Sequence, residues 1–377
     1  MAPRPRRKGR RARLDELTVP LAAIISPNPA SSAGGVERVC ALLAGILQDG
    51  GWETRIVGPP RAATQWEYRL GLGFVAQSIV SVRQARQCRP DLIVGNGFLG
   101  AGGGGSIPRV QILHGTMVGC ARALRGALPA REALRRGFGG GVAEALCARG
   151  AKRTVCVSEA VAEEARRWYR VRDAAVLANG VDVELFAPGD RAAARDSLGL
   201  APDRRYALFV GRFEAGKGAE QALQGARGAG YELLVAGRGA PAEAHSLGVL
   251  GPERLAEAYA ASDCVLLPSL YEACSLVVLE AIACGRPLLT TPVGWMKTLL
   301  HALPDYSRLC VRCDALDIEG RLRELPDLDA DRLAASARSY VLEHNSLGAW
   351  SAGWRELLDD FAPPAGSSIV SAAGGAR

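Results

Sequence analysis

The sequence predicts an α/β protein with two domains. Short apolar runs alternate with helical patterns along most of its 377 residues, and 45 of these residues are glycine. The alternation starts again in the second half, with an apolar run from Tyr206 to Val210. A chain of this length is long enough for two domains that each bury a core.

The positive charge is concentrated at the amino terminus. The formal net charge is +7, and residues 4–13 hold seven cations and no acid: Arg4, Arg6, Arg7, Lys8, Arg10, Arg11 and Arg13. The rest of the chain is therefore near neutral, which argues against a nucleic-acid partner. We expect residues 1–15 to be a disordered basic tail; the alternative is weak peripheral attachment to anionic lipid.

Other features of the composition point to a cytoplasmic protein. No apolar run reaches the roughly 18 residues of a membrane span, and Asp15, Glu16 and Pro20 interrupt any signal-peptide core. Ten scattered cysteines suggest reduced thiols. Cys310 and Cys313 form one C-x-x-C without a second pair, so we interpret them as ordinary thiols and predict no metal site.

The first elements form a βαβ unit with a glycine pair. Val19 to Ser26 and Thr54 to Val57 are expected strands, and a helix is expected from Gly34–Gly35 to about Gln48. Two glycines at a helix start leave backbone amides open to a phosphate. A tight turn needed only for packing is the alternative.

A second glycine motif supports a different hypothesis. Gly95, Gly97 and Gly100 follow the strand Leu92 to Val94 and match G-x-G-x-x-G, the dinucleotide-binding fingerprint. Residues 102–105 are all glycine, however, and disfavour the helix that should follow. We expect a loop here, and an NAD-dependent oxidoreductase remains the alternative.

One histidine lies where ligands bind in open parallel sheets. The expected strand Arg109 to Leu113 delivers His114 at its carboxyl end. Further on, Thr154 to Ser158 is an expected strand, followed by a helix to about Tyr169. Residues 176–188 then form the connection to the second half, with a turn at Asn179.

The second half carries a cationic loop. Arg212 and Lys217 lie in a glycine-rich loop after the strand that ends at Val210, where two cations would neutralise a diphosphate. A nucleotide-binding P-loop is excluded because no Ser or Thr follows the lysine. Glu232 to Ala236 is the next expected strand, with Arg238 just beyond it.

Residues 263–294 contain the main acidic motif. Cys264 to Leu267 is an expected buried strand, and Ser275 is the expected N-cap of a helix over 276–284. A loop carboxylate, Glu272, and an inner one, Glu280, flank this helix start, an arrangement that suits a nucleotide sugar. A solvated Glu272, with Glu280 paired to an arginine, is the alternative. Two helices are expected after this motif, over 330–344 and 347–361.

Four segments resemble those of retaining family 4 glycosyltransferases, which have the GT-B fold. They are E-x7-E at Glu272 and Glu280, G-G-V-E-R at 34–38, V-L-A-N-G-V-D-V-E-L-F-A-P at 176–188 and G-R-F-E-A-G-K-G at 211–218. The sequence departs from the family where E-G-F-G becomes Glu272-Ala-Cys-Ser. It also shortens the helix expected after Gly239, so the base of the nucleotide cannot be named.

The resemblance implies two Rossmann-like domains facing across a cleft, residues 16–182 on the acceptor side and 183–345 on the donor side. Residues 346–361 would pack back on the first domain, and 362–377 would be a disordered tail. The implied activity is metal-independent transfer from a UDP- or GDP-type sugar to a small molecule, such as a secondary metabolite or cell-envelope precursor. An epimerase or a non-catalytic nucleotide-binding protein of the same fold is an alternative.

The resemblance also assigns roles to residues. It implies catalytic roles for His114, Arg212, Lys217 and Glu272. Donor contacts are implied at Gly34, Gly35, Arg212, Lys217, Glu272, Ala273, Cys274, Ser275, Leu276 and Glu280. Further contacts at Asn179 and Arg238 are weaker expectations.

Overall fold

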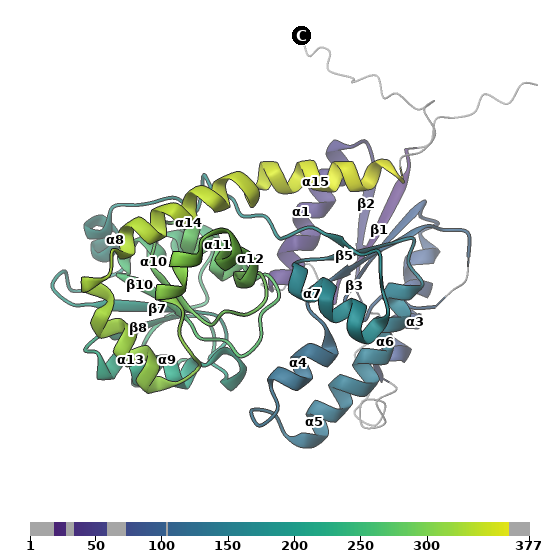
Figure 1. Cartoon of the computed structure of the whole chain (residues 1–377). Coiled ribbons are helices and arrows are strands. Elements are labelled where there is room, and N and C mark those ends of the chain that lie inside the picture. Colours follow the sequence, from purple (N-terminus) through teal and green to yellow (C-terminus); the bar gives the residue numbers. More distant parts are fainter. Residues whose placement is uncertain (1–18, 28–33, 59–72, 103–104, 362–377) are drawn as a thin grey trace, which may run out of the picture.

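The computed structural model describes residues 19–27, 34–58, 73–102 and 105–361. The tails expected over 1–15 and 362–377 lie outside these residues. Figure 1 shows two α/β units side by side, with two consecutive helices, residues 330–344 and 347–359, running along the top from the second unit to the first. No helix in the described ranges is long and apolar enough to span a membrane.

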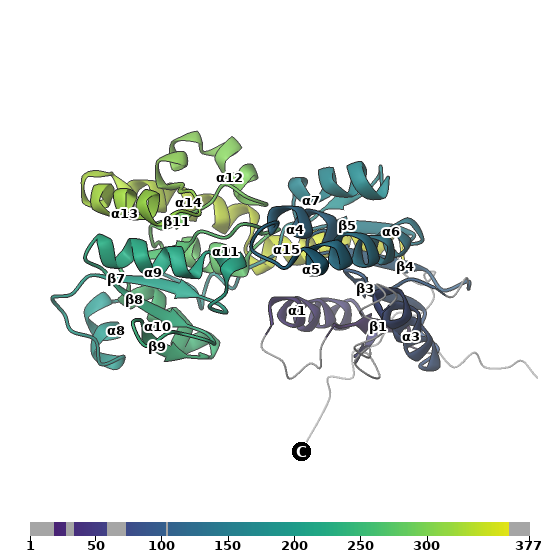
Figure 2. The ribbon, with the colours of Figure 1, turned by 90° about the horizontal axis from the view of Figure 1, so that it is seen from below.

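The first unit is built on a six-stranded sheet in the order β2-β1-β3-β4-β5-β6, with every pairing parallel. Its strands are β1 Leu21–Ile25, β2 Glu53–Val57, β3 Leu92–Asn96, β4 Arg109–Leu113, β5 Arg153–Cys156 and β6 Ala175–Val176. Its helices are α1 Gly35–Asp49, α3 Gly73–Gln87, α4 Met117–Ala123, α5 Ala130–Arg135, α6 Gly141–Arg149 and α7 Glu159–Glu164, with π-turns η1 Arg136–Gly140 and η2 Ala165–Tyr169. α1 and α3 cover opposite faces of this sheet, because Ala22 and Ile24 of β1 pack with Leu43 of α1, whereas Ala23 and Ile25 pack with Val82 of α3. α6 lies on the same side as α3, since Ser78 and Cys147 are 3.3 Å apart. Figure 2 shows both units from below.

The second unit is a five-stranded parallel sheet in the order β11-β10-β7-β8-β9. Its strands are β7 Tyr206–Val210, β8 Glu232–Ala236, β9 His245–Gly248, β10 Cys264–Leu267 and β11 Leu288–Thr290. Its helices are α8 Arg191–Ser197, α9 Ala219–Gly228, α10 Pro252–Ala261, α11 Leu276–Ala283, α12 Met296–Ala302, α13 Ala315–Glu324 and α14 Ala330–His344, with 3₁₀ turns η3 Ala215–Lys217, η4 Pro304–Leu309 and η5 Leu325–Asp327. The predicted α/β class is confirmed.

The helix α15, Leu347–Asp359, returns to the first unit. Its Trp350 and Trp354 are buried and stack edge to face at 6.1 Å between ring centroids, as their spacing of four residues predicts. Trp350 packs against Gly180, where an added Cβ would lie 2.7 Å from the tryptophan side chain. At the far end of the helix, Lys152 donates to the Asp360 carbonyl at 2.9 Å.

Two local predictions have clear outcomes. Eight residues separate β8 from β9 and form no helix, so the shortening of this segment is confirmed. The G-x-G-x-x-G segment is not followed by a helix: residues 97–102 and 105–108 form turns and extended chain. A Cβ on Gly95 of β3 would lie 2.4 Å from Gln111 Oε1 and 2.5 Å from the Leu99 carbonyl, so this glycine is required by packing against β4 and the turn after β3.

Candidate active site

The structure brings together two of the predicted catalytic residues, Lys217 and Glu272. Lys217 ends the turn η3 after β7, and Glu272 lies in the loop between β10 and α11. Lys217 Nζ donates to Glu272 Oε1 at 2.6 Å, and both side chains are partly buried. Because β7 and β10 are adjacent parallel strands, their carboxyl ends place both loops at the same edge of the sheet.

The backbone after Glu272 is held by its neighbours, although the family's glycines are replaced here. Trp295 N–H donates to the Ala273 carbonyl at 2.7 Å. Asn179 Nδ2 donates to the Cys274 carbonyl, also at 2.7 Å, so this residue joins the connection between domains to the acidic loop. Gly294, with φ of 57°, allows the close approach, because a Cβ there would lie 2.2 Å from the Glu272 carbonyl oxygen.

Two other predicted cations, Arg212 and Arg238, are exposed. Arg212 has an exposed side chain whose Nη2 is 3.1 Å from Glu214 Oε1. Arg238 is also exposed, and its carbonyl accepts from Phe213 N–H at 2.9 Å. Arg212 and Lys217 therefore pair with different carboxylates, Glu214 and Glu272.

The glycine pair lies against the start of α11. Gly34 is the N-cap of α1. A Cβ on Gly35 would lie 3.8 Å from the Cδ1 atom of Leu276, which is the first residue of α11. Ser275 is the N-cap residue of α11, as predicted, but its side chain makes no capping hydrogen bond. The amino termini of two helices, one from each domain, thus approach each other in the predicted donor site.

The inner carboxylate, Glu280, is buried and fully engaged. Arg38 Nη1 donates to its Oε1 at 2.7 Å, and the Tyr259 hydroxyl donates to its Oε2 at 3.0 Å. Burial raises the pKa of Glu280, while Arg38 and Tyr259 act to lower it. The sequence left open that an arginine pairs with Glu280, and the structure shows such a pair. The arginine, Arg38, comes from the other domain.

His114 is held in one tautomer. Asn96 Nδ2 donates to the Ile25 carbonyl at 2.8 Å, which turns its Oδ1 toward His114 Nε2, also 2.8 Å away. The Nε2 atom must therefore carry the proton, and Nδ1 is the acceptor. Burial lowers the pKa of His114 to about 4, so the ring is neutral at neutral pH.

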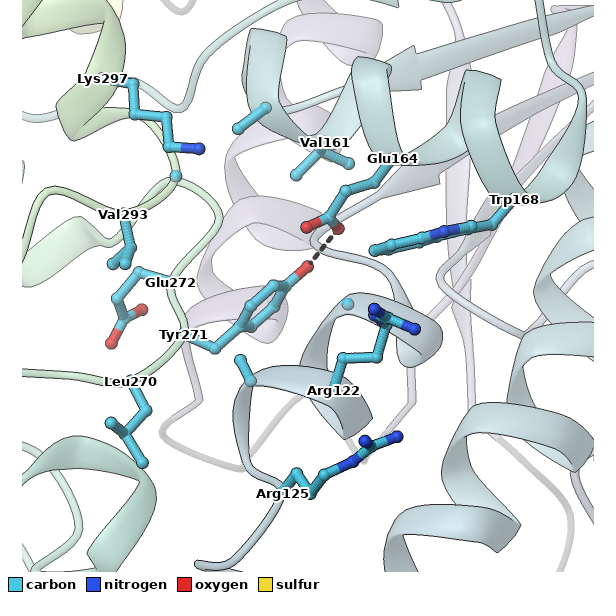
Figure 3. A pocket seen from close by; sticks show the side chains of 14 residues that line it. Arg122, Arg125, Val161, Glu164, Trp168, Leu270, Tyr271, Glu272, Val293 and Lys297 are labelled. Atoms are coloured by element: carbon cyan, nitrogen blue, oxygen red, sulfur yellow. Dashed lines mark hydrogen bonds between the residues drawn. The ribbon is translucent and has the colours of Figure 1, made fainter.

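A cavity of about 410 Å³ lies between the two domains. It is bordered by α4 and α7 of the first domain and by the loops after β10 and β11 of the second. Glu272 lines it, whereas His114, Arg212 and Lys217 do not. Figure 3 shows Tyr271 reaching across to Glu164 on α7.

A hydrogen-bond network joins the two domains beside the cavity. Tyr271 donates to Glu164 Oε2 at 2.9 Å and accepts from Thr116 N–H at 2.7 Å. The Thr116 hydroxyl donates to the same Glu164 oxygen at 2.5 Å. Burial raises the pKa of Glu164, while these two hydroxyl donors act to lower it.

The remaining charges on the cavity wall are cationic. Arg122, Arg125 and Lys297 line it from different elements, and none of them forms an ion pair with another described residue. Figure 3 shows the Lys297 side chain extending toward the cavity. Of the two acids present, Glu272 is already paired with Lys217. Sequence reasoning missed these residues, since none of the three cations belongs to a recognisable motif.

Two family descriptions match the chain in sequence. Glycosyltransferase Family 4 matches residues 33–185, and Glycosyl transferases group 1 matches residues 190–325. Curated relatives include the D-inositol 3-phosphate glycosyltransferases of Segniliparus rotundus, 34% identical over 49% of this chain, and Mycobacterium marinum, 37% identical over 49%. Each match covers 46% of the relative, so the chain spans just under half the length of these proteins.

Solved structures share the fold over nearly the whole chain. Sucrose-phosphate synthase from Thermosynechococcus elongatus has a TM-score of 0.74 at 20% identity, covering 90% of this chain and 98% of its own. WaaG, a glycosyltransferase involved in lipopolysaccharide biosynthesis, has a TM-score of 0.68 at 18% identity, and the match covers 89% of this chain and 99% of WaaG. Anabaena Alr3699/HepE, solved with UDP-glucose, has a TM-score of 0.66 at 16% identity, and the match covers 90% of this chain and 99% of that protein.

The two family matches, the paired parallel sheets and the acidic loop beside Lys217 agree with the resemblance seen in the sequence. The chain belongs to the family 4 glycosyltransferases of the GT-B fold.

Proposed function

We propose that this protein transfers a glycosyl group from a nucleoside-diphosphate sugar to a small anionic acceptor. The observation that carries the proposal is the contact of Lys217 Nζ with Glu272 Oε1, 2.6 Å apart, at the border of a cavity between the domains. A cation for the diphosphate and a carboxylate for sugar hydroxyls thereby lie next to each other and to the amino terminus of α11.

The donor would lie across the start of α11. Its diphosphate would bind Lys217 and the first backbone amides of the helix. Arg212 would break its ion pair with Glu214 and bind the diphosphate too. Glu272 would then be released to orient the sugar. The ribose diol would bind Glu280, which requires Arg38 to give up its 2.7 Å contact. Donor binding would therefore exchange three ion pairs, Arg212–Glu214, Lys217–Glu272 and Arg38–Glu280, for contacts to the ligand.

The proposed reaction retains the anomeric configuration. The bond between the anomeric carbon and the diphosphate oxygen breaks while the acceptor oxygen bonds to the same face of that carbon. The departing phosphate takes the acceptor's proton, and Lys217 and Arg212 stabilise the charge that develops on it. Neutral His114 would position the sugar. Because two cations perform the neutralisation, we propose that no divalent metal is needed, and activity should survive chelation with EDTA.

The cavity charges favour an anionic acceptor. Arg122, Arg125 and Lys297 surround a space whose acids are Glu164, held by two hydroxyls, and Glu272, held by Lys217. Three cations in a confined space attract a phosphate or carboxylate group. The names of the curated relatives, which include D-inositol 3-phosphate, support a phosphorylated polyol as the first acceptor to test.

The test is a transfer assay with radiolabelled UDP- and GDP-sugars, with and without D-inositol 3-phosphate. We expect product only when donor and acceptor are both present, with the donor's anomeric configuration retained in its NMR coupling constant. Conversion of the donor without acceptor would instead identify an epimerase. No turnover of any donor, with nucleotide binding intact, would identify a binding protein. An NAD-dependent oxidoreductase is disfavoured, because no helix follows Gly100 within the described residues 101–102 and 105–108.

A further inference from the structure

One helical segment of the first domain carries an apolar face that is exposed among the described residues. Leu134, Phe138, Val142 and Leu146 are 72%, 73%, 43% and 51% exposed, and they follow one another at intervals of four residues along α5, η1 and α6. Among the described residues, the other large apolar side chains exposed to this degree, Val19, Val176, Val249 and Leu316, are scattered. Isolated exposed apolar residues are ordinary, but an aligned row is not.

The row is straight because the segment contains a π-turn. In a regular α-helix, residues four apart drift by about 40° around the axis. The wider turn of η1, Arg136–Gly140, offsets this drift in the middle of the row. The helical conformation continues through both junctions, since Arg136 and Gly141 are right-handed helical. A segment of 20 residues is roughly 30 Å long.

Packing on the opposite side fixes this face outward. A Cβ on Gly140 would lie 2.5 Å from Met117 Cε, and one on Gly141 would lie 2.7 Å from Val118 Cγ2, so α4 lies directly against the helix backbone. The helix cannot turn its apolar row inward without losing this close contact. Figure 1 places α4 and α5 together at the lower edge of the first domain, away from α15. The same α4 carries Arg122 of the cavity.

Arginines flank the row, and no acid lies on the exposed face. Arg131 and Arg149 are exposed and stand three residues before Leu134 and three after Leu146. The acid of α5, Glu132, is paired with both Arg135 and Arg136. The acid of α6, Glu144, is buried and accepts from Met117 N–H and the Tyr169 hydroxyl, each at 2.6 Å.

This charge pattern decides what can cover the face. A second copy would bring arginine against arginine in either isologous orientation, which disfavours self-association. A row of Leu, Phe, Val and Leu with cations at both ends is instead the pattern of a helix lying in the plane of an anionic membrane surface. The apolar chains enter the interface, and the arginines reach the headgroups.

We propose that the exposed face of residues 131–149 docks the protein on a lipid surface that contains anionic headgroups. α4 then lies between the membrane and the cavity, which places the acceptor side of the cleft near the bilayer. The proposal goes beyond the transfer reaction and holds whichever acceptor is used.

The test is flotation of the full chain with vesicles of phosphatidylcholine alone or mixed with phosphatidylglycerol. We expect binding to the mixed vesicles that weakens with salt and is at least tenfold weaker for neutral vesicles. The variants L134Q/F138Q and R131E/R149E should each lose binding at least tenfold. L316Q and R227E, which alter exposed residues of the second domain, should bind as wild type does.

All four variants should match the wild type in circular dichroism and in the thermal shift with nucleoside diphosphates. A loss of vesicle binding would then be independent of the proposed transfer reaction. Absence of vesicle binding by the wild-type chain would overturn it. Unchanged binding in both first-domain variants would also overturn it and would implicate the cationic residues 4–13 instead. A wild-type dimer that L134Q/F138Q converts to a monomer, without vesicle binding, would show that the face is a self-association surface.

Discussion

Arg38 Nη1 lies 2.7 Å from Glu280 Oε1 and joins α1 of the first domain to α11 of the second, across 242 residues of sequence. The carboxylate is 1% exposed and the arginine 40% exposed, so one partner is buried and the other reaches solvent. The carboxylate expected to hold a ribose thus links the two domains.

We predict energetic coupling between these two residues. Removing Arg38 alone leaves Glu280 buried beside Tyr259 without its cation, so R38A should be destabilised by about 1–3 kcal/mol. The double variant R38A/E280A should lose less than the sum of the two single changes. Urea unfolding of the four proteins in the cycle gives the coupling energy, and additivity within about 0.5 kcal/mol would contradict the account.

We predict that Lys217→Ala weakens binding of a nucleoside diphosphate. Loss of a hydrogen bond to a charged group costs about 1.5–3 kcal/mol, which is roughly a 10- to 150-fold rise in Kd. Arg212→Ala should weaken binding as well, although the structure pairs this arginine with Glu214. Calorimetric titration measures both variants. Arg227→Ala, an exposed arginine on α9, is the control that should leave the affinity unchanged.

We predict that Gly294→Ala disrupts the acidic loop. Its φ of 57° and the 2.2 Å approach of the Glu272 carbonyl to the added Cβ mean that the loop carrying Glu272 must shift. The variant should therefore lose both stability and nucleotide affinity. The control is Gly320→Ala on α13, where a Cβ meets nothing within 4 Å. This change should be stabilising by up to about 1 kcal/mol. Equal behaviour of the two variants in thermal melts and titrations would refute the packing argument.

We predict a pH-dependent contribution to stability from Glu144. Burial raises its pKa to about 7 from its ordinary value of 4.5. Between these values the folded chain binds more protons than the unfolded chain, so this contribution falls as the pH rises from 4.5 through 7. Glu144→Gln keeps an oxygen acceptor for Met117 and Tyr169 and removes the ionisation.

The measurement for Glu144 is the free energy of unfolding of wild type and Glu144→Gln at pH 5 and pH 8. The stability of the wild type relative to the variant should be greater at pH 5 than at pH 8. Other groups cancel in this difference, including His114, whose pKa is lowered to about 4. A difference that does not change with pH would show that Glu144 is ionised throughout this range.

Sequence patterns predicted the strands more accurately than they predicted the residues that line the cavity. Tyr206–Val210 and Cys264–Leu267 were predicted to the residue, because strands buried on both faces read as short apolar runs. No helix was predicted over 117–149, a stretch in which Gly137 and the glycines at 139–141 are poor helix formers. In the structure the glycines allow α4 to lie against the π-turn η1.

The candidate site shows the same difference between local and distant contacts. Lys217 and Glu272 could be selected from their own loops, and the sequence left open that an arginine pairs with Glu280. The identity of that arginine, and the approach of Tyr271 to Glu164 across the cleft, depend on how the two domains dock. No spacing within one segment carries that information.

The central claim is that the cleft beside Lys217 and Glu272 binds a nucleoside diphosphate without a metal. The most direct test is a thermal-shift panel with UDP, GDP, TDP, ADP and NAD in EDTA, since a ligand at a hundredfold its Kd adds about 2.7 kcal/mol to the stability of the native state. We expect one nucleoside diphosphate to raise the Tm of the wild-type protein and to have little effect on Lys217→Ala. A rise with NAD alone, unchanged in Lys217→Ala, would contradict the claim.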